Sequence, residues 1–166
     1  DEPGPVNYYG SSKLAAEKVV LGSKLKWAIV RTVLVYGNVL VGNRSNIISW
    51  VRDNLSQGKA IKVVIDQWRT PTYVEDLAKG ILLILEKNAA GIYNISGDEG
   101  MSPYDMAVAT ADYLHLDKSL MEKVNAATFT QPATRPLRTG FVIDKAKREL
   151  GYQPISFKEA LKLMLG

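Results

Sequence analysis

The sequence predicts an α/β fold, and three observations support this. In the first half, short apolar segments with β-branched residues alternate with segments of helical period, an order typical of α/β proteins. The second half is more helical and carries shorter strand-like runs. At 166 residues the chain can form one domain with a hydrophobic core and is too short for two ordinary domains.

The first part of the chain predicts a loop, a helix and a strand. Residues 1–6 contain two prolines and a glycine, which predict the loop. Asn7 has a side chain suited to capping a helix, and residues 8–21 combine good helix formers with apolar residues at helical spacing. The apolar run at residues 27–31 predicts a buried strand, which residues 33–37 continue up to a glycine.

The middle of the chain alternates between helix and strand. Ser45 or Asn46 begins a helix that extends to about residue 56, and a strand follows at residues 61–65. Residues 66–73 are polar and aromatic with one proline, and we expect a loop there. The next elements are a helix over residues 74–87, with Leu77, Ile81, Ile84 and Leu85 inside, and a strand over residues 91–95.

The last part is mainly helical. Ser102 caps a helix that runs to about residue 114, with Pro103 at its first position. Residues 123–127 predict a strand, and residues 131–139, with two prolines and two arginines, predict a loop. Two more helices are expected, one over residues 144–150 that Gly151 ends and one that Ser156 caps and that runs to residue 165.

The composition excludes or disfavours several kinds of binding partner. The chain has no cysteine and one histidine, which excludes disulfides and multi-histidine metal sites, and we predict no metal centre. Its net charge is +4, and its basic residues are scattered along the sequence. This distribution disfavours nucleic-acid binding, whereas a mildly basic surface suits an anionic small molecule. No apolar run approaches the roughly 18–20 residues of a membrane span, and the first residues do not resemble a signal peptide. We therefore expect a cytoplasmic protein without a membrane partner.

Tyr9 and Lys13 are the first candidates for chemistry. They are one helical turn apart, so the phenol and the ammonium lie on one face of the predicted helix. A phenol has an ordinary pKa near 10, and a neighbouring cation lowers this pKa because it favours the phenolate. Such a tyrosine can exchange a proton with a carbonyl or alcohol oxygen near neutral pH. A surface pair without any chemistry has the same spacing, so the pair alone does not establish a catalytic site.

Several strings resemble those of the extended short-chain dehydrogenases/reductases, in the same order along the chain. YGSSKLAAE at residues 9–17 is similar to the Y-x-x-x-K helix of that family, and RTVLVYG at residues 31–37 resembles its R-T-x-x-V-Y-G segment. DQWRTPT at residues 66–72 resembles the D-Q-x-x-x-P-T string of the dTDP-4-dehydrorhamnose reductase branch. ATRP at residues 133–136 and GYQP at residues 151–154 resemble the C-terminal pattern of that branch. Any one string is weak, whereas the ordered set is strong.

The resemblance covers the C-terminal portion of such a protein and implies a Rossmann-like fold. It assigns residues 1–40, with the catalytic helix and the following strand, to the end of the dinucleotide-binding domain. It assigns residues 41–166 mainly to a smaller mixed α/β substrate-binding domain, with core elements returning at about residues 61–95. It also implies an upstream segment with a catalytic Ser or Thr and a glycine-rich turn, because the chain contains no such turn. We expect the 166 residues alone to be inactive.

The resemblance implies NADPH or NADH as the cofactor. Tyr9 would protonate the oxygen of a ketone as it is reduced, and Lys13 would lower the pKa of Tyr9 and bind the nicotinamide ribose. The segment Arg31, Thr32, Val33 and Leu34 would lie beside the nicotinamide. An ion pair is the alternative role for Arg31.

The substrate that the resemblance implies is a nucleotide-linked 4-keto-6-deoxy sugar. Arg135, and after it Arg138, would bind the diphosphate, because guanidinium groups match phosphate oxygens in pairs. The other predicted substrate-binding residues are Asn46, Asp66, Gln67, Trp68 and Thr72. The resemblance also allows for a homodimer.

Two alternatives stay open. One is a nucleotide-sugar epimerase or dehydratase of the same superfamily, which the D-Q-x-x-x-P-T string disfavours. The other is a non-catalytic regulatory or binding subunit with the same fold, which the intact pair of Tyr9 and Lys13 disfavours.

Overall fold

The computed structural model describes residues 2–38, 46–130 and 133–166. Its strands form parallel pairs within these ranges: β1 (Ala28–Arg31) with β6 (Gly91–Asn94), β2 (Val35–Tyr36) with β5 (Thr72–Tyr73), β3 (Ile61–Val64) with β7 (Met121–Val124), and β4 (Trp68–Arg69) with β8 (Arg138–Thr139). The helices are α1 (Tyr8–Leu21), α2 (Ile47–Leu55), α3 (Val74–Glu86), α4 (Pro103–Tyr113), α5 (Asp144–Leu150) and α6 (Phe157–Leu165). Short 3-10 turns at Lys118–Leu120 and Ala126–Thr128 flank β7.

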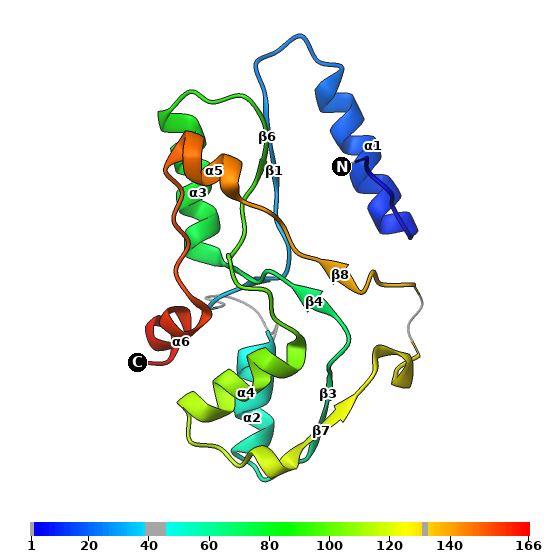
Figure 1. Ribbon diagram of the computed structural model, residues 1–166, viewed down its shortest axis with the longest axis vertical. Helices are drawn as coiled ribbons and strands as arrows, with labels where there is room; N and C mark the ends of the chain where they lie inside the picture. The colour runs from blue at the N-terminus through cyan, green and yellow to red at the C-terminus, as the bar shows by residue number, and fades with distance from the viewer. Residues whose placement is uncertain (1, 39–45, 131–132) are drawn as a thin grey trace.

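The elements gather in two groups (Figure 1). In the first group β1 and β6 lie side by side, with α3 and α5 on one side of them and α1 on the other. In the second group α2 and α4 pack on each other and on β3, which pairs with β7. The paired strands β4 and β8, here called the β4–β8 ribbon, lie between the two groups together with α6.

Clusters of buried apolar side chains hold each group together. One cluster, which includes Val51 and Met121, fills the space between α2, α4, β3 and β7. Another, which includes Ile84 and Tyr93, packs α3 and α5 against β6. A third, which includes Phe157, joins α6 to α2, α4, β2 and β5. Burying such side chains is the main favourable contribution to folding.

The predicted helix caps are confirmed. Asn7, Asn46, Ser102 and Ser156 each accept a hydrogen bond on their side-chain oxygen from a backbone N–H of the turn that follows. These bonds satisfy donors that have no partner within the helix itself. Gly151 ends α5 in the left-handed conformation, with φ of 70°, which glycine adopts readily because it has no Cβ.

The strands differ from prediction in three places. Residues 33–37 do not continue β1, because Leu34 adopts a φ of 44° and turns the chain, so that β2 pairs with β5 instead. The segments 66–73 and 131–139, predicted as loops, contain the short strands β4, β5 and β8. The strand expected at residues 123–127 begins earlier, at Met121, and gives way to a 3-10 turn. Strand pairs of two residues depend on long-range partners, which local sequence does not reveal.

Several predictions of burial are wrong for the first group of elements. β1 was expected to be buried, yet its residues are exposed or half-buried, because in the described part of the chain it pairs along one edge only. On α3, Ile81 and Leu85 were expected inside and are 42% and 69% exposed. Ile84, also expected inside, is buried, and Gly80 lies buried on the same helix. α1 buries none of its side chains.

The predicted domain division at residue 40 stays a prediction. Of the segment expected to return to the core, residues 61–95, α3 and β6 lie beside β1, whereas β3 lies with β7 in the second group. Among the described residues, no helix combines the length and the apolar composition that crossing a membrane requires.

Gly97 permits a close approach that the loop at residues 66–72 requires. A Cβ at this position would overlap the carbonyl oxygen of Pro71, a backbone atom that cannot move aside without shifting the loop. We expect Gly97→Ala to lower the free energy of unfolding by about 1–3 kcal/mol, as overpacking does elsewhere. Chemical denaturation measures this. Gly100→Ala is the matched control, because its Cβ would lie 3.8 Å from Trp68 Cε3, an ordinary contact. Equal stability of the two variants would contradict the prediction.

Candidate active site

α1 brings Tyr9 and Lys13 to the same face, as their spacing predicts. The ammonium of Lys13 lies over the Tyr9 ring, with its Nζ 5.4 Å from the ring centroid. Tyr9 is 70% exposed, so its hydroxyl is accessible to a bound molecule. Asn7 fixes the start of this helix by accepting the N–H of Gly10 at 2.8 Å. A phenol with a cation beside it is thus present on the surface of the first turn and a half of α1.

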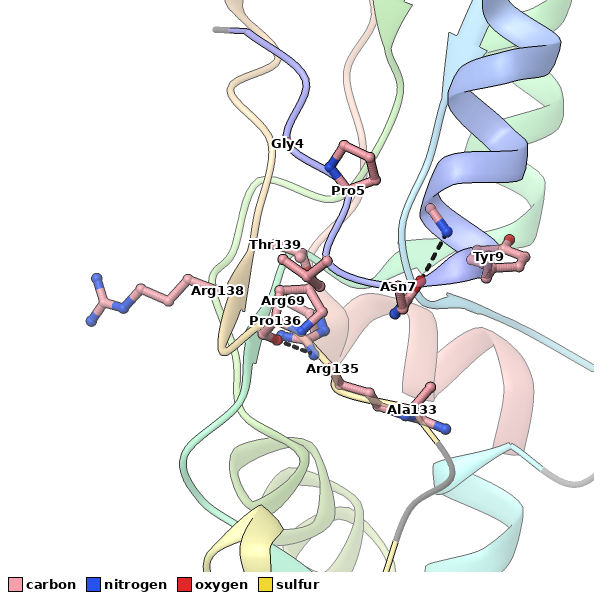
Figure 2. A pocket seen from close by; sticks show the side chains of 12 residues that line it. Gly4, Pro5, Asn7, Tyr9, Arg69, Ala133, Arg135, Pro136, Arg138 and Thr139 are labelled. Atoms are coloured by element: carbon pink, nitrogen blue, oxygen red, sulfur yellow. Dashed lines mark hydrogen bonds between the residues drawn. The ribbon is translucent and has the colours of Figure 1, made fainter.

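Tyr9 opens on a cavity of about 690 Å³ (Figure 2). One wall is the loop before α1, with Pro5 and Asn7, and the opposite wall is the segment from Ala133 to Thr139. The Asn7 amide crosses between the walls and donates a hydrogen bond to the carbonyl of Thr134 at 2.8 Å. The cavity therefore joins residues that lie far apart in the sequence. Lys13 is not among the residues that line it.

Arginine is the charged residue of this cavity, and none of its described lining residues is acidic. Arg69, Arg135 and Arg138 are all among the residues that line it. Figure 2 shows Arg138 extending away from Tyr9, whereas Arg135 lies below the Tyr9 side of the cavity. A cavity with several cations and no carboxylate is suited to an anion.

Arg69 was not among the predicted site residues. It lies within the DQWRTPT string, but the two bonds that connect its guanidinium to the cavity wall go to residues far away in the sequence. Arg69 donates to the carbonyls of Pro136 and Leu137 at 2.8 and 3.1 Å. Burial, and after it the charge of Arg135, lowers the pKa of Arg69 below its ordinary value.

The two predicted diphosphate ligands diverge. Arg138 pairs in register with Trp68 on the β4–β8 ribbon, and both side chains line a second cavity of about 340 Å³ near Gly100 and Gly140. Arg135 lies outside this second cavity. The structure thus brings Arg135 together with Tyr9, and places Trp68 with Arg138.

Most of the other predicted substrate residues are bonded within the protein. The Asn46 amide donates to the Gly37 carbonyl at 2.7 Å, in addition to capping α2. Asp66 accepts the N–H of Ala126 at 2.9 Å. Gln67 is buried and accepts from Arg69 at 3.3 Å. Each of these side chains has a demonstrable structural role, and their contact with substrate stays a prediction.

The predicted cofactor segment, residues 31–34, is hydrogen-bonded to Glu17 and to Thr72. The Arg31 guanidinium donates to both carboxylate oxygens of Glu17 on α1, at 2.8 and 2.5 Å. Thr72, which is fully buried, donates to the carbonyl of Val33 at 2.7 Å and accepts from the Thr32 hydroxyl at 3.1 Å. Arg31 therefore has the ion pair that was the alternative to a cofactor contact. Contacts of Thr32, Val33 and Leu34 with a cofactor stay predictions.

Several known proteins are similar to this chain. The sequence matches the RmlD substrate binding domain family over residues 1–166. It is 33% identical to dTDP-4-dehydrorhamnose reductase of Mycolicibacterium smegmatis, over 98% of this chain and 49% of that protein. It is also 32% identical to methionine adenosyltransferase 2 subunit beta of Xenopus tropicalis, over 74% of this chain and 38% of that protein. The chain spans about half the length of the curated relatives it matches, or less.

A solved structure supports the fold. The chain superposes on dTDP-4-dehydrorhamnose reductase from Bacillus anthracis in complex with NADP with a TM-score of 0.87 and 30% identity. The match covers 99% of this chain and 57% of that one. The predicted α/β fold, similar to that of the extended short-chain dehydrogenases/reductases, is confirmed.

The ion pair of Glu17 and Arg31 gives a prediction for stability against pH. The hydrogen bond from Arg31 holds the pKa of Glu17 below its ordinary value of 4.5. The stabilisation is therefore fully present above that pH and is lost as the pH falls through the lowered pKa of the folded state. We expect Glu17→Gln to lower the free energy of unfolding by roughly 1 kcal/mol at neutral pH, near the upper end for such pairs.

The difference between Glu17→Gln and wild type should disappear in acid, below the lowered pKa. Denaturant titrations at neutral and acid pH measure both values. Glu122→Gln is the control, because Glu122 is 61% exposed and lies 3.7 Å from Lys62. A pH-independent loss in Glu17→Gln would show that the carboxylate charge does not stabilise the protein.

Proposed function

We propose that this chain, which belongs to the RmlD substrate binding domain family, supplies the catalytic tyrosine and the substrate site of an NAD(P)H-dependent reductase. The substrate proposed is a nucleotide-linked 4-keto-6-deoxy sugar. One observation carries the proposal: the phenol of Tyr9, with Lys13 over its ring, opens on the cavity that Arg135 lines. The named relatives support the same chemistry, since the Mycolicibacterium smegmatis protein is a dTDP-4-dehydrorhamnose reductase.

Tyr9 is suited to act as the general acid. When a ketone becomes an alcohol, the carbonyl carbon receives a hydride and the oxygen receives a proton. Tyr9 would donate that proton from its hydroxyl, and solvent would return a proton to the phenolate. The Lys13 ammonium lies over the Tyr9 ring, on the helix face that carries the proposed acid. The exposed position of Tyr9 at the cavity gives the substrate oxygen access to the hydroxyl.

The cofactor proposed is NADPH or NADH. The Bacillus anthracis relative was solved with NADP, which supports a nicotinamide dinucleotide. Lys13 fits a ribose partner, because an ammonium has three donors for hydroxyl groups and this one lies beside the proposed acid. A reduced nicotinamide supplies the hydride when bound.

The diphosphate of the substrate would bind to Arg135. The cavity volume of about 690 Å³ lies within the range of small-molecule sites, roughly 300–1,000 Å³. Its cationic lining complements a diphosphate, and Arg135 is the exposed guanidinium on the Tyr9 side. Such a pose would place the sugar between Arg135 and Tyr9. A cytoplasmic location and a homodimer stay predictions.

A non-catalytic subunit is the second candidate. The similarity to methionine adenosyltransferase 2 subunit beta favours it, because that protein is named as a subunit of another enzyme. A subunit of this kind would bind a partner protein and show no turnover of keto sugars. The assay below separates the two functions.

Tyr9→Phe tests the catalytic assignment. With the full-length protein, NADPH and a dTDP-linked 4-keto-6-deoxyhexose, we expect loss of absorbance of the reduced nicotinamide. Removing the hydroxyl should lower kcat by about 10²–10⁴-fold, the usual contribution of a general acid, while NADPH binding stays near wild type. Tyr8→Phe is the matched control, because Tyr8 is the neighbouring tyrosine and is 90% exposed.

Three outcomes would decide against the reductase. Unchanged turnover in Tyr9→Phe would remove Tyr9 from the mechanism. A wild-type protein that converts the sugar without net consumption of NADPH would be an epimerase or dehydratase. A wild-type protein that binds NADPH and turns over no keto sugar would support the binding subunit.

Arg135 and Arg138 should contribute unequally to substrate binding. Because Arg138 extends away from the Tyr9 side of the cavity, we expect Arg135→Gln to raise KM for the sugar nucleotide about 10- to 100-fold, as the loss of charge-assisted hydrogen bonds does. Arg138→Gln should change KM by roughly threefold or less. Steady-state kinetics at saturating NADPH measure both values. The reverse order would place the diphosphate on the Trp68 side of the β4–β8 ribbon.

A further inference from the structure

We propose that Arg69 is a positioning residue that holds the backbone at Pro136 and Leu137 so that Arg135 faces the Tyr9 cavity. The inference rests on the proposed function in one respect, namely that Arg135 binds the diphosphate. Arg69 itself would contact no substrate.

The guanidinium of Arg69 is bonded on several sides. Its Nη1 donates to the carbonyls of Trp68 and Leu137, at 2.7 and 3.1 Å. Its Nη2 donates to the carbonyl of Pro136 at 2.8 Å and to Gln67 Oε1 at 3.3 Å. Figure 2 shows the bond to Pro136 at the centre of the cavity wall. One side chain thus joins β4 to the segment that carries Arg135.

These bonds leave little capacity for an anion. A guanidinium has five N–H donors, and four interactions of Arg69 with protein oxygens use the Nη1 and Nη2 groups. Paired recognition of a phosphate requires two N–H groups of one guanidinium side by side. Arg69 could offer such a pair only by giving up at least one of these four bonds. Arg135, which is exposed, does not face this conflict in the described structure.

The backbone of the wall has few other links to β4. The N–H of Trp68 donates to the Leu137 carbonyl at 2.7 Å, and the β4–β8 ribbon pairs Arg69 with Thr139. Both links lie at or after Leu137. The Pro136 carbonyl, next to Arg135 in the chain, is bonded by Arg69. Arg69 is therefore the contact from β4 that lies nearest to Arg135, while Asn7 bonds the Thr134 carbonyl on the other side of that residue.

The half-buried charge of Arg69 is compensated by these carbonyls. The charge of Arg135 is close enough to contribute to the lowered pKa of Arg69, and no described lining residue of the cavity is acidic. The two cations repel each other, and an anion bound at Arg135 would relieve that repulsion. A polar group that is removed from water and bonded to carbonyls keeps a fixed orientation.

A double-mutant cycle tests whether Arg69 acts through Arg135. Affinity for dTDP is measured by calorimetry on the full-length wild type, Arg69→Met, Arg135→Gln and the double variant. We expect Arg69→Met to weaken dTDP binding roughly tenfold in the wild-type background and less than about twofold in the Arg135→Gln background. Affinity for NADPH should stay unchanged. Equal losses in both backgrounds would make Arg69 a direct ligand and overturn the inference.

Arg69→Lys separates geometry from charge. Lysine keeps the positive charge but lacks the planar fork that reaches several carbonyls, so we expect its dTDP affinity to match that of Arg69→Met. Restored affinity in Arg69→Lys would show that charge alone matters and would overturn the positioning role. Arg52→Met is the control for arginine removal, because Arg52 is exposed on α2 and paired with Asp53.

Hydrogen exchange keeps the inference testable if wild type does not bind dTDP, an outcome that would reject the proposed function. Amides of residues 133–139 should exchange several-fold faster in Arg69→Met than in wild type, with β3 and α4 unchanged. The unchanged elements also show that the variant is folded. Equal exchange in residues 133–139 would overturn the inference whatever the substrate is.

Discussion

The placement of α1 depends on polar contacts at its two ends. This helix buries none of its side chains, so in the described structure packing alone does not fix it. In its C-terminal half, Glu17 accepts two hydrogen bonds from Arg31 of β1. At its N-terminus, Asn7 caps the first turn and donates to the carbonyl of Thr134. Tyr9 lies between these contacts, so the position of the proposed acid follows from an ion pair and an amide. Such bonds are directional and set orientation as well as distance.

The proposed site is assembled from segments far apart in the sequence. Tyr9 comes from the first helix, Arg69 from a two-residue strand and Arg135 from a segment near the C-terminus. The backbone of that last segment is bonded from both sides, by Asn7 at Thr134 and by Arg69 at Pro136. The wall that carries Arg135 is thus held by side chains of the two elements that it faces. The shape of the cavity wall and the position of the Arg135 charge therefore depend on the same two bonds.

The sequence predicted those features that depend on interactions between residues close together in the chain. The i,i+4 spacing placed Tyr9 and Lys13 together, and the cap of α1 was evident from Asn7, because both depend on a few adjacent residues. The role of Arg69 was missed because its carbonyl partners lie in a segment at residues 136–137. A backbone carbonyl has no sequence signature. The exposure of Ile81 was missed for a related reason, since periodicity gives the face of a helix but not what covers it.

The parallel pairing of the strands also has a consequence for synthesis on the ribosome. No parallel pair can close as a local hairpin, so each early strand emerges long before its partner. β4 meets β8 only after residue 139 has been translated, and the wall that carries Arg135 forms with it. Chains rich in such distant pairings fold slowly. The nascent chain therefore contains the proposed proton donor well before it contains the pocket in which that donor could act.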